Sequence, residues 1–157
     1  MNQDAHSHLK QLGKPTSLPT SPEEALLEAI PNRWPDSSYT VQIVCEEFTC
    51  VCPLTGQPDF AKIIIEYRPD KHLVESKSLK LYLGSYRNVG IFHEFVVNAI
   101  CHDLVKILEP HFIEVKGEFS VRGGIRIIPT ARWEKSEAPS VSVSALSSGT
   151  FEMPAQK

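Results

Sequence analysis

A short connection between two predicted strands carries a thiol and a carboxyl group. Cys52 is followed by Pro53, and Asp59 comes after Gly56 and Pro58. These residues favour a turn, because proline fixes φ and glycine accepts positive φ. A thiol reacts as its thiolate, and a nearby carboxyl group can hold or deliver a proton. The pair therefore predicts nucleophilic chemistry, with a buried cysteine in a structural turn as the plainer alternative.

Cys50 adds a second thiol two residues before Cys52, and a strand would turn both to the same side. A Cys-x-Cys pair can bind metal, and His93, His102 and Cys101 are further donors. A closed zinc site needs about four ligands, and no second spaced pair occurs. We therefore predict no metal site.

Two polar residues, His93 and Glu94, stand at the start of a predicted helix. An exposed helix start explains them, since a carboxylate there gains from the helix dipole. The alternative is functional: a histidine that relays protons and a carboxylate that accepts two N–H bonds from a ligand. The residues alone favour the first interpretation.

Three cationic residues, Lys77, Lys80 and Arg122, lie near predicted turns. A solvated surface is the usual explanation for such residues. The sharper hypothesis is a phosphate-binding cluster, because helix starts and basic side chains both attract phosphate. The chain has neither a Walker motif nor a Gly-x-Gly-x-x-Gly fingerprint, so any dinucleotide site would not be of the Rossmann type.

Hydrophobic periodicity predicts the order strand, strand, helix, helix, strand, strand after a short first helix. Strands are expected over 39–45, 60–67, 111–119 and 122–128, and helices over 23–30, from about Ser76 to Tyr86, and over 91–108. Ser21 and Ser76 are the expected helix caps. The second long helix is expected to bury Phe92, Phe95, Val96, Ala99, Ile100 and Leu104.

This order predicts an α+β fold, an antiparallel four-stranded sheet with two helices between its strand pairs and on one face. Such a sheet leaves two edges exposed, and subunits can hide them by pairing edge to edge. A closed oligomeric barrel is therefore plausible.

The whole chain of 157 residues has a net charge of −3 and 41% hydrophobic residues, which suits one globular domain. We expect a flexible arm over 1–21, one domain over 22–133 and a disordered tail over 134–157, where Ser, Ala, Pro and Glu dominate.

The net charge and the hydrophobic runs also indicate which partners and which cellular compartment to expect. A net charge of −3 gives no reason to expect nucleic-acid binding. No apolar run approaches the roughly 20 residues of a membrane span, and the N-terminus lacks the features of a signal peptide. We expect a cytoplasmic protein whose four cysteines are thiols.

Four segments together resemble one enzyme family. They are ESKSLKLY at 75–82, CPLTGQPD at 52–59, FHE at 92–94 and RGG at 122–124. All are similar to segments of the NADPH-dependent nitrile reductases of queuosine biosynthesis, the QueF type, in its short single-module form. The resemblance runs from about residue 31 to 129 with consistent spacing.

The resemblance implies an activity and an assembly. The family reduces the small molecule 7-cyano-7-deazaguanine to 7-aminomethyl-7-deazaguanine, a step toward a modified tRNA, and consumes two NADPH. It has the tunnelling fold, whose subunits form homo-oligomeric pentameric barrels stacked face to face. Its sites lie between subunits, and no direct contact with nucleic acid or membrane is implied.

The resemblance also assigns roles to residues. It makes Cys52 the nucleophile that forms a thioimide, Asp59 the proton donor and His93 an aid to proton transfer. The implied substrate-binding residues are Glu75, Ser76 and Glu94. The implied NADPH-binding residues are Lys77, Ser78, Lys80 and Arg122.

Two alternatives remain, one a related enzyme and the other a protein of a different class. One is a GTP cyclohydrolase-like enzyme, which would share the fold but would need zinc ligands that this chain lacks at convincing spacing. The other is a non-catalytic purine-binding module, which would use Glu75 and Glu94 but leave Cys52 and Asp59 idle.

Overall fold

The computed structural model describes residues 9–10 and 17–136. Its elements, in chain order, are β1 (Ala29–Pro31), β2 (Val41–Val51), β3 (Pro58–Arg68), β4 (His72–Val74), α1 (Ser76–Ser85), the short 3₁₀ helix η2 (Tyr86–Asn88), α2 (His93–Leu108), β5 (Phe112–Phe119) and β6 (Thr130–Glu134).

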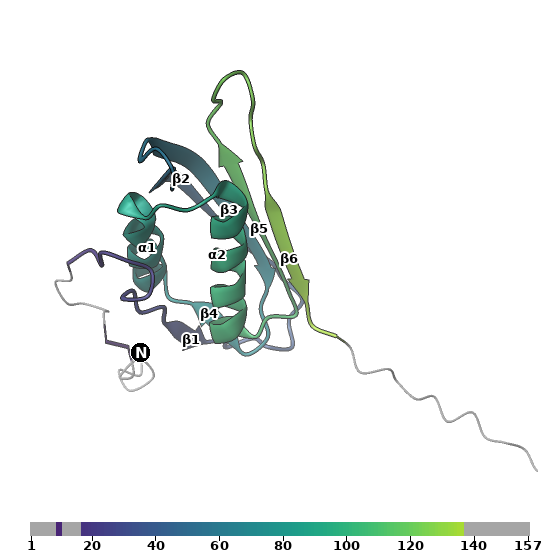
Figure 1. The fold of residues 1–157 in the computed structure, drawn as a ribbon. Helices are drawn as coiled ribbons and strands as arrows, with labels where there is room; N and C mark the ends of the chain where they lie inside the picture. The colour runs from purple at the N-terminus through teal and green to yellow at the C-terminus, as the bar shows by residue number, and fades with distance from the viewer. Residues whose placement is uncertain (1–8, 11–16, 137–157) are drawn as a thin grey trace, which may run out of the picture.

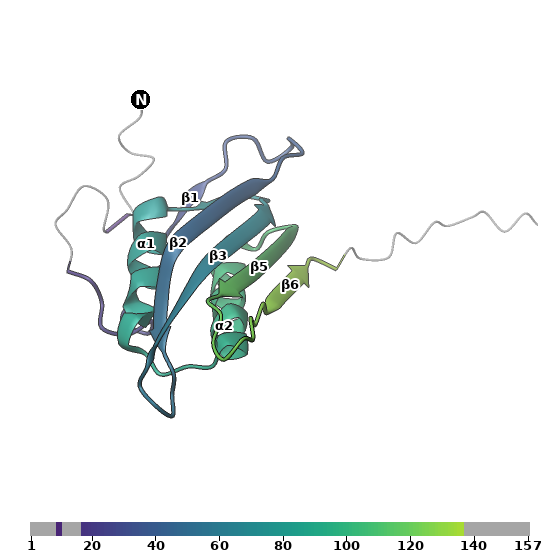
Figure 2. The same ribbon diagram turned by 90° about the horizontal axis from the view of Figure 1, so that it is seen from above.

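A four-stranded antiparallel sheet in the order β2-β3-β5-β6 forms the main layer, and α1 and α2 cover one of its faces (Figures 1 and 2). β1 and β4 form a separate two-stranded sheet at one end of the helices. The predicted α+β class, with two helices inserted between strand pairs, is confirmed.

The core lies between this sheet and the helices. On β3 the side chains of Ile63, Ile65 and Tyr67 are buried, and on β5 those of Ile113 and Val115 are buried. Each strand alternates, because successive side chains point to opposite faces. Burial of one such aliphatic side chain contributes about 1.5–3 kcal/mol. The predicted strands 39–45, 60–67 and 111–119 are confirmed as β2, β3 and β5.

The predicted fourth strand over 122–128 is wrong. Gly123 and Gly124 have φ of 59° and 80°, and Arg122 and Ile125 bond to each other across them. The glycines therefore form the turn of a hairpin, since positive φ is costly for other residues. The paired strand is β6, which begins at Thr130.

The predicted first helix over 23–30 is also wrong. Residues 22–24 form a single turn, and the chain then runs extended into β1. Ala25, Leu27 and Ala29 pack against the core. Their period of two is that of extended backbone, not that of a helix.

Helix α1 buries Leu79, Tyr82 and Leu83, as the periodicity predicts. Its N-cap, however, is not Ser76. The Glu75 carboxylate accepts the backbone N–H of Lys77 and of Ser78. A carboxylate reaches two of the unpaired N–H groups of a first turn, whereas a hydroxyl reaches one.

Helix α2 buries part of its predicted face. Val96, Ile100 and Leu104 are buried as predicted, Ala99 is half-buried, and the helix also buries Val97, Cys101 and Leu108. The prediction is wrong for Phe92 and Phe95, which are 44% and 64% exposed, respectively, and whose rings meet edge to face. At 100° per residue, Phe95 lies opposite the centre of that apolar stripe.

Parts of the predicted arm and tail are described. Leu9 is buried, and the backbone N–H of Lys10 donates to Glu28 Oε1 at 2.6 Å. Glu134 ends β6, and Lys135 N–H donates to the His111 carbonyl. The predicted disordered tail from residue 137 onward lies outside the described residues.

Within the described residues, neither α1 nor α2 has the length and the apolar run that crossing a bilayer requires.

Candidate active site

The turn that carries Cys52 directly follows β2 and closes on itself. The Cys52 N–H donates to the Gln57 carbonyl at 2.8 Å, and the Cys52 carbonyl accepts the Gly56 N–H at 2.9 Å. Gly56 has φ of 67°. Because this conformation favours glycine, the turn depends on the residue type at this position.

The groups around the Cys52 thiol favour its thiolate form. A hydrogen bond from the Thr55 side chain lowers the pKa of Cys52, and the backbone N–H groups of Leu54 and Thr55 and the charge of Arg122 add to this effect. These groups stabilise the thiolate, which is the nucleophilic form. The hydrogen-bonded turn therefore carries a thiol whose thiolate form is favoured.

The other three thiols have raised pKa values. Burial raises the pKa of Cys50 to about 12, and the nearby Asp59 and Cys52 act in the same direction. Burial also raises the pKa of Cys45 and of Cys101. All four cysteines are free. Of the four thiols, Cys52 alone has a lowered pKa.

Asp59 lies on β3, directly opposite Cys50 on β2, and its side chain is 3% exposed. Arg122 Nη1 donates to Asp59 Oδ1 at 2.5 Å, and His93 Nε2 lies 3.3 Å from Asp59 Oδ2. Each carboxylate oxygen therefore has a partner, as a buried carboxylate requires.

Arg122 reaches this carboxylate from the hairpin between β5 and β6. Its Nη2 also donates to Gln57 Oε1 at 2.6 Å. The guanidinium therefore joins the buried carboxylate to the Cys52 turn, and the planar fork of arginine suits two such bonds.

His93 begins α2, and the segment before it packs on the Cys52 turn. Val51 exchanges backbone hydrogen bonds with Val89 and Ile91. A Cβ on Gly90 would lie 3.2 Å from Pro53 Cα, so a glycine permits this close approach. The end of β2 and the start of α2 are thereby held together.

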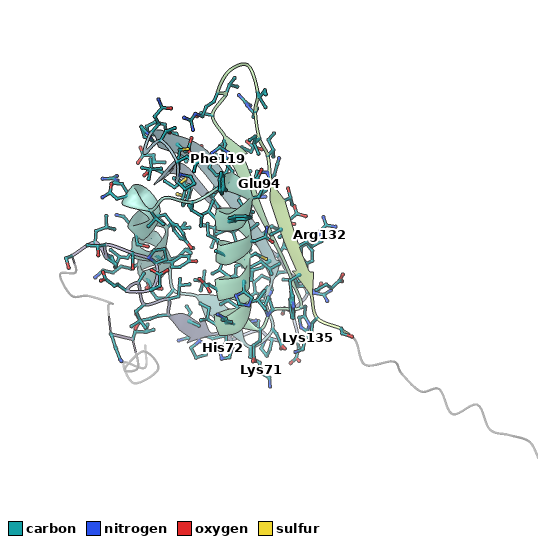
Figure 3. All side chains as sticks on the ribbon, in the orientation of Figure 1. Lys71, His72, Glu94, Phe119, Arg132 and Lys135 are labelled. Carbon is teal, nitrogen blue, oxygen red and sulfur yellow. The ribbon has the colours of Figure 1, made fainter. Side chains whose placement is uncertain are left out.

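Glu94 follows in the first turn of α2 and is exposed. It lies at the same end of the molecule as Phe119 (Figure 3). A carboxylate at a helix start gains from the helix dipole, and its oxygens can accept N–H bonds from a ligand.

A second group of predicted residues begins α1. The Glu75 carboxylate is committed to the helix cap, with Oε1 accepting from Lys77 N at 2.9 Å and Oε2 from Ser78 N at 2.7 Å. The Ser78 hydroxyl donates to the Glu75 carbonyl at 2.8 Å and accepts the Glu28 N–H at 3.0 Å. Glu75 and Ser78 are therefore part of the packed structure.

Ser76 and Lys80 line a cavity of about 500 Å³ between α1 and β2. Its walls are mostly apolar, and Arg87 also lines it. This size is that of small-molecule sites, which combine apolar walls with a few polar groups.

The group around Cys52 and the group at the start of α1 lie at opposite ends of the fold. The Tyr67 hydroxyl accepts the Val74 N–H at 3.3 Å, which places the start of α1 near the end of β3. Asp59 is at the other end of that strand, eight residues before Tyr67 and roughly 26 Å away at about 3.3 Å per residue. Figure 3 shows Glu94 and His72 at these opposite ends.

The structure thus brings together Cys52, Asp59, His93 and Arg122, with Glu94 on the same side. It places Glu75, Ser76, Lys77, Ser78 and Lys80 along α1. Two further residues, Gln57 and Phe119, contact the first group. Gln57 is part of the CPLTGQPD run, whereas Phe119 carries no local signal beyond its place in an alternating strand.

Among the described residues, no group of three or more His, Cys, Asp or Glu side chains could hold a metal ion.

Residues 58–138 match the family model described as "QueF-like protein". The chain is also 54% identical over 121 residues to the "NADPH-dependent 7-cyano-7-deazaguanine reductase" of Neisseria gonorrhoeae (strain NCCP11945), covering 77% of each protein. It is 54% identical over 119 residues to the protein of the same name from Thermomicrobium roseum, covering 76% of this chain and 92% of the relative.

The relative of the same name from Methylorubrum extorquens (strain PA1) is 52% identical over 121 residues, with 77% of this chain and 79% of the relative covered. Among solved structures, the archaeosine synthase QueF-Like in its apo form superposes with a TM-score of 0.59 at 21% identity. The match covers 64% of this chain and 99% of that one, and it supports the fold alone.

Proposed function

Because this chain belongs to the QueF-like family of NADPH-dependent 7-cyano-7-deazaguanine reductases, we propose that it reduces the nitrile of 7-cyano-7-deazaguanine to a primary amine. The product is 7-aminomethyl-7-deazaguanine, a precursor in queuosine biosynthesis. One observation carries the proposal for the site: the pKa of Cys52 is lowered on a turn that adjoins the buried Asp59 and His93.

The overall reaction consumes one nitrile, two NADPH and two protons, and yields one amine and two NADP⁺. Cys52 thiolate adds to the nitrile carbon, which forms a C–S bond, and the nitrogen takes a proton. The resulting thioimide accepts a hydride more readily than the nitrile does. Covalent catalysis thereby replaces one difficult step with two easier ones. Loss of the thiolate leaves an imine for the second reduction.

Asp59 and His93 are proposed to supply the protons. His93 Nε2 lies 3.3 Å from Asp59 Oδ2, within reach of proton exchange. Asp59 follows the Cys52 turn directly on β3, so we propose its carboxyl group as the acid for the nitrogen of a nitrile bound at Cys52. General acid catalysis of this kind contributes roughly 10²–10⁴-fold.

The α1 cavity fits part of a dinucleotide. It has apolar walls against which a ring can pack, and Lys80 and Arg87 can meet phosphate charge. NADPH bound there would supply the hydrides. Ser76 lines the same cavity, and we propose Lys77, Ser78 and Arg122 as further cofactor contacts. Arg122 would have to leave Asp59 or Gln57 to make such a contact.

We further propose that the active site lies between subunits of a tunnelling-fold barrel, in stacked pentamers. Glu75 and Ser76 start α1 at the end of the fold remote from Cys52, so a neighbouring subunit would supply them. Large apolar side chains around the Cys52 end are exposed and suit an interface: Leu54, Phe60, Phe95, Val121 and Ile125. The free thiols suit the reducing cytoplasm.

The function is tested with purified protein, 7-cyano-7-deazaguanine and NADPH. We expect two NADPH oxidised per amine formed, and one nitrile adduct per chain by intact mass in the absence of NADPH. Cys52→Ala should lose the adduct, and the matched variant Cys50→Ala should keep it. Absence of NADPH oxidation by the wild-type protein, or an adduct on Cys50, would contradict the proposal.

A further inference from the structure

The imidazole of His93 contacts a neighbouring aromatic ring on one face and a carboxylate at one edge. Its ring lies 3.8 Å from the ring of Phe119, centroid to centroid, with 11° between the planes. Its Nε2 edge lies 3.3 Å from Asp59 Oδ2. Phe119 is 1% exposed, so the stack lies at the edge of the core, where water does not replace it.

Phe119 is itself closely packed. A Cβ built on Gly117, two residues earlier on β5, would lie 2.8 Å from Val97 Cγ2 and 2.9 Å from Phe119 Cε2. Glycine therefore lets α2 and the phenyl ring pack directly against the strand. Phe119 also pairs with Ala61 on β3, two residues beyond Asp59. The phenyl ring thus has a fixed position relative to both His93 and the carboxylate.

The backbone does not set the plane of a histidine ring. The χ2 torsion of histidine is broad, because it joins an sp³ carbon to an sp² ring. His93 is the first residue of α2, where no preceding helical turn restricts it. In this structure the restriction comes from the stacked phenyl ring.

From this geometry we propose that Phe119 is a positioning residue for proton delivery. It fixes the plane of His93 so that Nε2 faces Asp59, and it acts through His93 without touching the substrate. The inference rests on the proposed function, in which Asp59 and His93 supply the protons. A displacement of about 1 Å in such a group can cost about 10²-fold in rate.

The first test compares two side chains of the core. Phe119→Leu removes the ring that stacks on His93. Leu104→Ala removes a core side chain of α2 that is 0% exposed and lies three turns beyond His93. Both leave a cavity in the core, so a loss due to packing alone would appear in both.

We expect Phe119→Leu to lower kcat about 10–100-fold with the KM for the nitrile within about twofold. Leu104→Ala should keep kcat within about threefold, and Phe119→Tyr, which retains the ring face, should recover most of the rate. Phe119→Met keeps the side-chain volume without a flat face and serves in place of Phe119→Leu if that protein does not fold.

The second test does not depend on turnover. Nitrogen NMR of the imidazoles in the ligand-free proteins reports which His93 nitrogen carries the proton. In wild type and in Leu104→Ala we expect one state, with Nε2–H donating to Asp59. In Phe119→Leu we expect an average over ring orientations, and in Phe119→Tyr a return to the single state.

Equal kcat losses in Phe119→Leu and Leu104→Ala, or His93 signals unchanged by Phe119→Leu, would overturn the inference. Inactivity of the wild-type protein on the nitrile would instead overturn the proposed function. In that case the NMR comparison alone decides whether Phe119 orients His93.

Discussion

At the scale of single residues, two thiols two positions apart have opposite properties. Burial raises the pKa of Cys50 to about 12. The Thr55 hydroxyl and two backbone N–H groups lower the pKa of Cys52. The difference is one of local hydrogen bonding and solvation, since Cys50 is buried on β2 and Cys52 lies on the turn that follows it.

This difference predicts the pH dependence of alkylation. A lowered pKa means that Cys52 remains thiolate down to a lower pH than an ordinary thiol, and its reactivity falls as the pH drops through that pKa. Thr55→Val removes the leading hydrogen bond, so the midpoint should move to higher pH. Alkylation rates followed by peptide mass spectrometry measure the midpoint.

The control for this experiment is Thr40→Val, an exposed threonine before β2. It should leave the Cys52 midpoint in place, and Cys50 should react only after unfolding. A Thr55→Val midpoint equal to that of wild type would show that the threonine does not stabilise the thiolate.

The two carboxylates near Cys52 should have different roles, with Glu94 serving substrate recognition and Asp59 serving the chemistry. Glu94→Gln places an amide donor against the donor edge of the deazaguanine, which should weaken nitrile binding by about 1–3 kcal/mol. Asp59→Asn keeps the size but removes the acid, so binding should survive while turnover slows about 10²–10⁴-fold. Calorimetry on a Cys52→Ala background measures binding, and single-turnover NADPH oxidation measures chemistry.

Glu46→Gln, on the exposed side of β2, is the control and should change neither quantity. If Asp59→Asn abolishes binding while Glu94→Gln blocks only turnover, the two roles are reversed.

At the scale of elements, the start of α1 depends on a side chain that the resemblance assigns to the substrate. Glu75 is 6% exposed, and both of its oxygens cap the helix. Ser78 joins the same cap to the segment before β1 through Glu28. A residue can serve both roles only if the ligand meets a carboxylate that is already oriented by backbone N–H groups.

Stability measurements can identify the cap. Glu75→Ala should lower the free energy of unfolding by about 0.5–2 kcal/mol, the cost of losing an N-cap. Ser76→Ala should change it by much less, because the exposed Ser76 side chain is not the cap. Urea denaturation of the two variants under identical conditions provides the comparison. A larger loss in Ser76→Ala would contradict the observed capping.

At the scale of the whole molecule, one chain does not bring the proposed residues to a single place. Cys52 and Asp59 lie at one end of β3, and Glu75 lies beyond the other end. A repeated interface that joins different surfaces of neighbouring subunits would unite the two ends. The exposed apolar side chains near Cys52 mark the surface that such an interface would bury.

Mixed oligomers test this arrangement. Cys52→Ala and Glu75→Ala should each be inactive alone. After the two proteins are unfolded together and refolded, about a quarter of the sites should combine two intact halves across a heterologous interface and regain activity. Size-exclusion chromatography and native mass spectrometry verify the mixing.

Two outcomes of the mixing experiment are decisive. Recovery of activity supports a site shared between subunits. Mixed oligomers that remain inactive would place Cys52 and Glu75 in the same subunit's site or remove Glu75 from it. A mixture of Cys52→Ala with Cys52→Ser serves as the negative control.

The sequence by itself determined the features that depend on near neighbours. The period of two predicts β3 and β5, and the period of 3.6 predicts the lengths of α1 and α2. Proline and glycine between Cys52 and Asp59 predict the turn that carries both. These signals lie within a few residues, where local sterics and propensity control the backbone.

Only the tertiary structure decided the contacts between distant segments. Arg122 meets Asp59 across 63 positions of sequence, and Phe119 stacks on His93 from another strand. Periodicity shows that a helix has an apolar side, but it does not show where the sheet lies. Phe95 was therefore misplaced in the core.

The strand after the Gly123-Gly124 turn shows the same limit. An apolar run there predicts a strand over 122–128, yet the register with β5 places β6 at Thr130–Glu134. Strand pairing is set by hydrogen bonds to a partner and by which face is buried, and a local pattern contains neither.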